Sequence, residues 1–213
     1  MVNDITMRMM VVLMSLHGWK GKIINVETAF LYGDLEEEIY MTIPKGLGEY
    51  EEKDLKDECV LLKRSIYGLV QAACAWWKNF TKSLENIGFE KSANDNCFMV
   101  RRNTYGTVFL CIYVDDVCCI GEPNAISNAI NEIEKIYCIK RVGELTEFIG
   151  VNIENTDEGI FLSQKDTVTR LENVFREHVN KLRIYNIPAA TNDTILRPNK
   201  EDILLSEEEQ STY

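Results

Sequence analysis

Two adjacent aspartates interrupt the most strand-like part of the chain, and this feature limits the possible folds most strongly. Asp115 and Asp116 separate a β-rich apolar run at 108–114 from a second one at 117–120. Short apolar runs rich in valine and isoleucine are typical of buried strands. The sequence therefore predicts a hairpin of two core strands with both aspartates at its tip.

Neighbouring carboxylates repel each other unless cations neutralise them, and hard divalent cations are their natural partners. Phosphoryl transfer with two metals requires carboxylates from separate strands, which hold the ions about 3.5–4 Å apart. One hairpin cannot supply such a centre alone. The alternative is that Asp115-Asp116 is an ordinary solvated turn, but the apolar runs and the preceding Tyr113-Val114 favour the functional interpretation.

Apolar periodicity predicts helices on both sides of this hairpin. Ile5, Met9, Val12 and Leu16 have helical spacing after a cap at Asn3 or Asp4, and Gly18 is a suitable stop. The strongest helix signal is an apolar face that Gly88 would end, formed by Leu69, Ala72, Trp76, Phe80, Leu84 and Ile87. A third helix is indicated by Ile126, Ile130, Ile133 and Tyr137.

Shorter patterns complete the predicted order of elements. Residues 22–26 and 97–100 are strand-like, and 148–153 with 160–162 indicate a further hairpin around 157–159. The acidic stretch 34–58 predicts an exposed loop and an edge strand. A helix is predicted at 164–178, and a capping box at 206–209 follows an irregular tail. The central order of strand, helix, strand, strand and helix predicts an α+β fold of the split βαβ type, with a ferredoxin-like sheet and helices on one face.

Composition narrows the possible functions. A chain of 213 residues can bury one substantial core, and its net charge of −11 argues against a self-sufficient nucleic-acid binder. Seven cysteines without a CxxC pair, and two distant histidines, support neither a disulfide framework nor a zinc site. No apolar stretch reaches the length of a membrane span, which predicts a soluble, unsecreted protein.

Several ordered motifs resemble the reverse transcriptase domain of copia-type long-terminal-repeat retrotransposons. They are VETAFLYGDLEEEIYM at 26–41, SIYGLVQA at 65–72, Trp76 and YVDD at 113–116, with GEL at 143–145, FIG at 148–150 and IFLSQ at 160–164 as further similar segments. The resemblance implies a polymerase palm at 1–162, which includes the acidic loop 34–58. The start of a thumb or connection would follow at 163–213. It also implies truncated fingers and a partial thumb.

The resemblance further implies an RNA-directed DNA polymerase that uses Mg²⁺ or Mn²⁺, with a primer-template and deoxynucleotides as partners and possibly the rest of a polyprotein, without a membrane. Asp115 would be the main metal ligand and Asp116 a lesser ligand or a support. Substrate contacts would fall to Phe30, Gln71 and Tyr113. Phe30 would screen the sugar 2′ position; alternatively Phe30 is a core aromatic residue and Gln71 a surface residue at a helix start.

One departure from the family pattern concerns catalysis directly. The family has an aspartate immediately before Val26, where this chain has Asn25. An amide keeps one weak oxygen ligand but loses the charge that holds divalent cations. Val70, Ala73 and Cys74 replace a lysine, a proline and an arginine of the family, which removes two positive charges.

These departures predict weak or absent polymerisation. Asn25 would then be a strand-end residue that satisfies backbone groups. Two alternatives remain open at this stage. The chain is a non-catalytic relic or interaction module whose acidic 34–58 surface meets a basic partner, or it is a polymerase fragment that regains activity within a longer polyprotein.

Overall fold

The computed structural model describes residues 2–44 and 59–176. The chain divides into two compact units, Met1–Thr167 and Val168–Tyr213. Its described helices are α1 (Asp4–His17), the 3₁₀ helix η1 (Ala29–Tyr32), α3 (Ala72–Asn86), α4 (Pro123–Glu134) and α5 (Lys165–Val174). Its described strands are β1 (Lys20–Val26), β2 (Tyr40–Thr42), β3 (Cys59–Leu61), β4 (Glu90–Lys91), β5 (Phe98–Asn103), β6 (Gly106–Tyr113), β7 (Asp116–Gly121), β8 (Ile139–Glu144), β9 (Glu147–Phe148), β10 (Val151–Thr156) and β11 (Gly159–Ser163).

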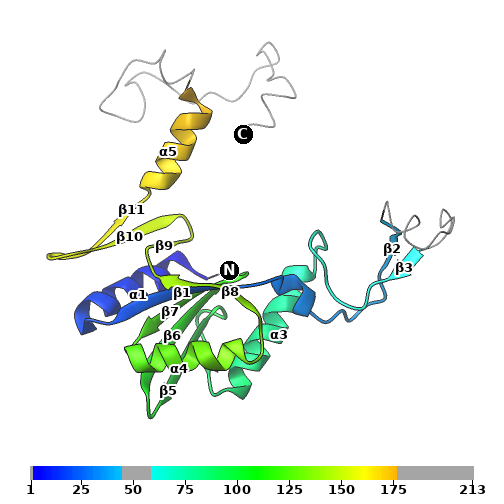
Figure 1. Ribbon diagram of the computed structural model, residues 1–213, viewed down its shortest axis with the longest axis horizontal. Coiled ribbons are helices and arrows are strands. Elements are labelled where there is room, and N and C mark those ends of the chain that lie inside the picture. The colour runs from blue at the N-terminus through cyan, green and yellow to red at the C-terminus, as the bar shows by residue number, and fades with distance from the viewer. Residues whose placement is uncertain (1, 45–58, 177–213) are drawn as a thin grey trace. The chain divides into compact units, whose positions relative to one another are not determined.

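The main sheet has six strands in the order β4-β5-β6-β7-β1-β8. Every neighbouring pair is antiparallel, so β1 and β6 run parallel to each other with β7 inserted between them. The chain passes from β1 to β6 by way of α3, and from β7 to β8 through α4 (Figure 1). The structure is thus a mixed α and β fold with antiparallel sheets, in line with the predicted α+β class.

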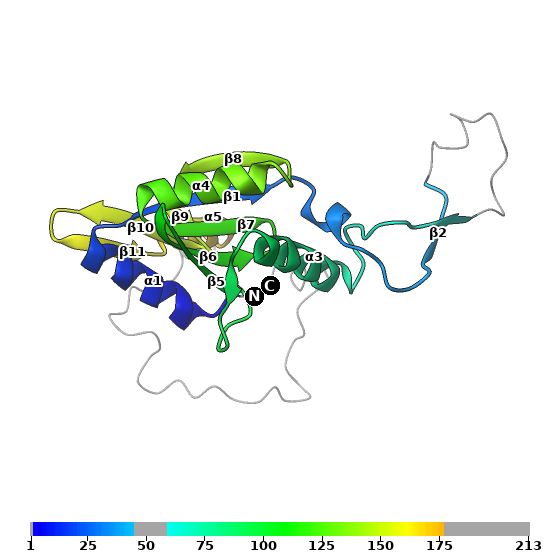
Figure 2. The ribbon, with the colours of Figure 1, turned by 90° about the horizontal axis from the view of Figure 1, so that it is seen from below.

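Helices cover both faces of this sheet. Arg101 on β5 donates to the Ile87 carbonyl just after α3 and to Glu132 and Asn128 on α4, so α3 and α4 share one face. Gly21 on β1 lies against α1 on the other face, because a Cβ there would come within 3.1 Å of the Met14 Cε atom. Figure 2 shows α1 and α4 on opposite sides of the sheet. The two helices of the predicted central unit therefore share a face, and α1 adds a second layer.

Helix α1 begins and ends where the sequence predicts. The Asn3 side chain accepts a hydrogen bond from the Ile5 N–H, and Gly18 ends the helix in the left-handed conformation with φ of 60°. The buried face is different from the one that the spacing suggested. Met7, Met10, Val11 and Met14 are buried, whereas Ile5, Met9, Val12 and Leu16 are exposed. Both faces are apolar, and periodicity alone does not distinguish them.

An aromatic cluster fixes α3 to the end of α4. Trp76 and Phe80 on α3 stack with ring centroids 4.7 Å apart, and Tyr137 meets both rings edge-on. The Tyr137 hydroxyl lies 2.7 Å from Asn79 Oδ1 and 2.8 Å from Ser83 Oγ, which satisfies its polar end inside the core. The predicted apolar face of this helix is confirmed.

The remaining elements follow the predicted order with small differences. The hairpin expected at 148–153 and 160–162 is a three-stranded sheet, because Ile149 and Gly150 have positive φ and separate β9 from β10. Strand β2 lies in the acidic stretch and pairs with β3, which directly follows that stretch. Residues 45–58 lie outside the described part. The tail beyond residue 176, which includes the predicted capping box, also lies outside the described residues. In the second unit, the described residues Val168, Leu171 and Val174 of α5 are exposed.

All seven cysteines are free thiols, in agreement with the prediction of no disulfide framework. Four of them are buried, and burial raises the pKa of Cys111 and of Cys119 to about 12. Such thiols carry little thiolate at neutral pH and are poor nucleophiles. No helix in 2–44 or 59–176 is long and apolar enough to cross a membrane.

Asp95 attaches the N-terminus of α1 to the loop before β5. Its Oδ2 atom accepts hydrogen bonds from the Asn3 N–H at 2.9 Å and the Thr6 hydroxyl at 2.6 Å, and its Oδ1 atom accepts one from the Cys97 N–H. Burial acts to raise the pKa of Asp95, but these three hydrogen bonds outweigh it and hold the pKa below its usual 3.8. The ionised form is therefore the one that stabilises the fold.

We expect Asp95→Asn to lower the stability at pH 7 by about 1 kcal/mol, because charge-assisted hydrogen bonds are lost. A depressed folded-state pKa stabilises the protein above the unfolded pKa, and this stabilisation disappears as the pH falls through the folded value. In thermal melts, the difference in stability between Asp95→Asn and the native chain should therefore disappear below pH 3.8. Asp157→Asn, in the exposed turn between β10 and β11, is the control. Parallel pH profiles for Asp95→Asn and the native chain would contradict this role.

Candidate active site

The two aspartates lie at the tip of the β6–β7 hairpin, as predicted. Tyr113 pairs with Asp116, which leaves Val114 and Asp115 as the two turn residues. Val114 has φ of 52°, a strained left-handed conformation for a β-branched side chain. Two contacts hold the turn: the Trp76 indole N–H donates to the Val114 carbonyl at 2.7 Å, and the Val26 N–H donates to the Asp115 carbonyl at 2.8 Å.

Strand β1 brings Asn25 directly opposite this tip. Asn25 and Asp116 are cross-strand partners, and the Asn25 Nδ2 atom donates to the Asp116 Oδ1 atom at 2.9 Å. Asn25 therefore lies on the strand that faces the hairpin, and its side chain bonds to Asp116 and not to the backbone groups that the sequence suggested. An aspartate at this position could not make the same contact, because two carboxylates offer only acceptors. The amide thus occupies an oxygen that would otherwise be available to a cation.

The electrostatics of the tip reflect two crowded carboxyl groups. Burial raises the pKa of Asp115, and the adjacent negative charge of Asp116 raises it further, against the effect of a backbone hydrogen bond. A bound cation would relieve this repulsion. The Asp116 carboxylate accepts a hydrogen bond from the Asn25 amide, which carries no charge to offset that of the carboxylate.

Phe30 packs against Tyr67, a residue to which the sequence motifs gave no role. Phe30 lies on η1, half-buried, and its ring centroid is 4.6 Å from that of Tyr67. Burial raises the pKa of the Tyr67 phenol, and the charge of Asp115 raises it further, so phenol and carboxylate are within electrostatic reach. Tyr67 stood inside the motif at 65–72, but its approach to Asp115 depends on the loop path between β3 and α3.

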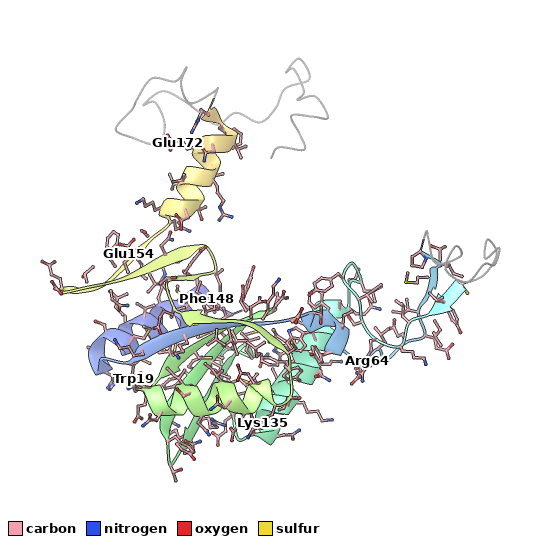
Figure 3. All side chains as sticks on the ribbon, viewed as in Figure 1. Trp19, Arg64, Lys135, Phe148, Glu154 and Glu172 are labelled. Atoms are coloured by element: carbon pink, nitrogen blue, oxygen red, sulfur yellow. The ribbon has the colours of Figure 1, made fainter. Side chains whose placement is uncertain are left out.

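Gln71 occupies a different place from the other predicted substrate residues. It lines a small pocket with Asp34, Leu35, Glu36, Glu37, Cys74, Ala75 and Lys78. Lys78 pairs with Glu36 at 2.7 Å, and Asp34 pairs with Arg64, which lies on the connection from β3 to α3 (Figure 3). The structure therefore brings together Asn25, Tyr113, Asp115 and Asp116, links Phe30 to them through Tyr67, and places Gln71 in a separate acidic pocket.

Two acidic residues that follow Asn25 in the chain, Glu27 and Asp34, have partners of their own. Glu27 accepts a hydrogen bond from the Cys138 thiol at 3.0 Å, and its N–H donates to the Cys138 carbonyl. Asp34 is held by Arg64. Across 2–44 and 59–176, no cluster of three or more histidine, cysteine, aspartate or glutamate residues could hold a metal. The donor set at the tip, two carboxylates and an amide that already donates to one of them, does not fit a two-metal centre.

Comparison with known proteins resolves the family. Residues 2–184 match the model of the family described as reverse transcriptase (RNA-dependent DNA polymerase). The chain belongs to this family. The reverse transcriptase match extends through every element of the site described above, and it confirms the family that the motifs indicated.

This reverse transcriptase chain is similar to Pol polyproteins of copia-type transposons and to a putative transposon protein. It is 32% identical over 152 residues to the Retrovirus-related Pol polyprotein from transposon TNT 1-94 of Nicotiana tabacum, covering 70% of this chain and 11% of the relative. It is 29% identical over 148 residues to that from transposon RE1 of Arabidopsis thaliana, covering 69% and 10%. It is 26% identical over 185 residues to the putative transposon Ty5-1 protein of Saccharomyces cerevisiae, covering 84% and 58%.

The chain thus spans about a tenth of the length of the two plant polyproteins. No solved structure matches it.

Proposed function

We propose that this chain is a reverse transcriptase palm whose two-metal centre is incomplete at Asn25, so that it polymerises DNA weakly or not at all. The observation that carries the proposal is the 2.9 Å hydrogen bond from Asn25 Nδ2 to Asp116 Oδ1. Asp115 and Asp116 are the metal ligands of this proposal, and Asn25 is the degenerate third position. Mg²⁺ or Mn²⁺ is the cofactor that a carboxylate at position 25 would help to bind.

Charge explains why one amide matters so much. A two-metal centre concentrates four positive charges, and the protein offsets them mainly with carboxylates on separate strands. With Asn25 in place, the described tip contributes two carboxylates from one hairpin only. One weak divalent-cation site is compatible with this donor set, whereas a pair of closely spaced ions is not.

The proposed substrates follow from the family and from the tip geometry. A primer-template and deoxynucleotides would lie on the side of the tip that carries Asp116, Tyr113 and Phe30. The Phe30 ring, supported by Tyr67, would face the sugar. The net charge of −11 opposes phosphate binding, so we expect the isolated chain to bind nucleic acid weakly.

Divalent-cation binding tests the proposal without requiring a primer-template. We expect Mn²⁺ titration calorimetry to show weak binding to the native chain and about tenfold or more tighter binding to Asn25→Asp, because a carboxylate replaces a neutral ligand. Adding Asp115→Ala to Asn25→Asp should remove the gain. Mg²⁺ should follow the same order with lower affinity.

The matched control is Asn131→Asp, which adds the same charge at an exposed position on α4. It should leave Mn²⁺ binding unchanged. Equal affinities for Asn25→Asp and Asn131→Asp would show that bulk charge, and not a restored centre, governs cation binding. Tight binding by the native chain would also refute the proposal.

The same hydrogen bond favours a second candidate, a non-catalytic module in which Asn25 has a purely structural role. In that case the fold would be retained for contact with a basic partner through the acidic surface. Binding of a primer-template by the Asn25→Asp chain favours the polymerase proposal. Binding of a basic protein surface by both chains, without nucleic-acid binding, favours the module.

A further inference from the structure

The Trp76 side chain of α3 makes a hydrogen bond to the turn that carries the aspartates. Trp76 is 1% exposed, and its indole N–H donates to the carbonyl of Val114 at 2.7 Å. The β6–β7 ladder pairs 108–113 with 116–121, so the Val114 carbonyl lies outside it. Trp76 thus supplies this carbonyl with a donor that the hairpin itself does not provide.

The contact falls where the backbone is strained. Val114 holds φ of 52°, which a valine adopts only when its surroundings impose it. The next carbonyl, that of Asp115, accepts from the Val26 N–H at 2.8 Å. The turn is therefore fixed from two sides, by α3 through Trp76 and by β1 through Val26.

We propose that Trp76 is a positioning residue for the aspartate hairpin, which it holds against β1 through its indole N–H. The ring also belongs to the aromatic cluster with Phe80 and Tyr137. Packing and positioning are separable, because phenylalanine keeps an aromatic ring in the cluster and lacks the N–H donor. The consequence for metal ligands rests on the proposed function, whereas the placement of the turn does not.

Trp77 provides a matched control on the same helix. Its indole N–H donates to the Asn96 carbonyl at 3.2 Å, in the loop before β5, and the Lys91 ammonium lies 5.1 Å from its ring. Trp77→Phe therefore loses the same kind of hydrogen bond on the same helix, but the lost partner is the Asn96 carbonyl and not the carbonyl of Val114. It should leave the hairpin in place.

Amide hydrogen exchange measured by NMR on the native chain tests the proposal directly. The Val26 N–H reports on the turn because it donates to the Asp115 carbonyl, and the Ile112 N–H, which donates to Cys97, reports on the core. We expect Trp76→Phe to speed exchange at Val26 by about tenfold more than at Ile112, because a local opening becomes easier. Trp77→Phe should leave exchange at Val26 nearly unchanged, because it removes a hydrogen bond to Asn96 and none to the turn.

Two results would overturn the proposal. In the first, Trp76→Phe speeds exchange at Val26 and Ile112 equally, which identifies Trp76 as a packing residue only. In the second, Trp77→Phe affects Val26 as strongly as Trp76→Phe does.

A second measurement uses Mn²⁺ and the Asn25→Asp chain. Adding Trp76→Phe should weaken Mn²⁺ binding by about tenfold relative to adding Trp77→Phe, because the ligands are no longer held in place. If Asn25→Asp binds no Mn²⁺, the proposed function is wrong, and the exchange data alone decide the role of Trp76. If Mn²⁺ binds and both tryptophan variants behave alike, the positioning role is wrong and the proposed function stands.

Discussion

Primer extension on an RNA template should be at background with the native chain and should rise about a hundredfold with Asn25→Asp, because metal ions at the reacting oxygens contribute several kcal/mol to such reactions. The substitution exchanges an amide for a carboxylate of nearly the same shape. It also breaks the hydrogen bond to Asp116, so the Asp116 oxygen becomes available to a cation. The assay requires Mg²⁺ or Mn²⁺ in excess and a labelled primer.

The controls separate chemistry from binding. Asn25→Asp combined with Asp115→Ala should return to background, and Asn131→Asp should match the native chain. Robust extension by the native chain would overturn the prediction of inactivity. If Asn25→Asp binds Mn²⁺ but does not extend a primer, the same substitution should be tested within a longer polyprotein, where activity would identify the chain as a polymerase fragment.

The second large effect concerns stability. Gly121 ends β7 with φ of +152°, and a Cβ there would lie 2.2 Å from the Thr107 carbonyl oxygen and 2.9 Å from the Val108 Cα atom. Both are backbone atoms of β6, which cannot move without breaking the β6–β7 pairing. We expect Gly121→Ala to destabilise the fold by about 4 kcal/mol or more, since overlap adds to backbone strain.

Urea denaturation checks this value against a matched glycine. Gly18 also has positive φ, at +60°, but nothing lies within 4 Å of a Cβ added there. Gly18→Ala should therefore cost only about 1 kcal/mol, from the left-handed conformation itself. Equal urea midpoints for Gly121→Ala and Gly18→Ala would show that the overlap with Thr107 does not lower the free energy of unfolding.

The order of elements was predictable because local patterns determine it. The Asn3 side chain caps the start of α1, and Gly18 ends this helix in the left-handed conformation. In α3, the apolar face around Trp76 and Phe80 is the one that is buried. The hairpin was predictable for a similar reason, since two apolar runs leave only a short turn for the aspartates. These features depend on residues that are near one another in the sequence.

The details of the site depend on distant residues, and the sequence did not reveal them. Periodicity in α1 identified a helix but not its buried face, because methionine and valine occur on both sides. The contact of Trp76 with Val114 spans 38 positions, and its only sequence signal was that Trp76 belongs to a motif. Tyr67 likewise required the path of its loop.

The pairing of Asn25 with Asp116 also bears on which residues the fold accepts at position 25. The Asn25 amide donates a hydrogen bond to Asp116 and keeps its place in the β1–β7 register, so the fold accommodates an asparagine at this position. Every asparagine codon becomes an aspartate codon when its first base changes from A to G. A single A-to-G transition in the gene is therefore enough to place an aspartate at position 25.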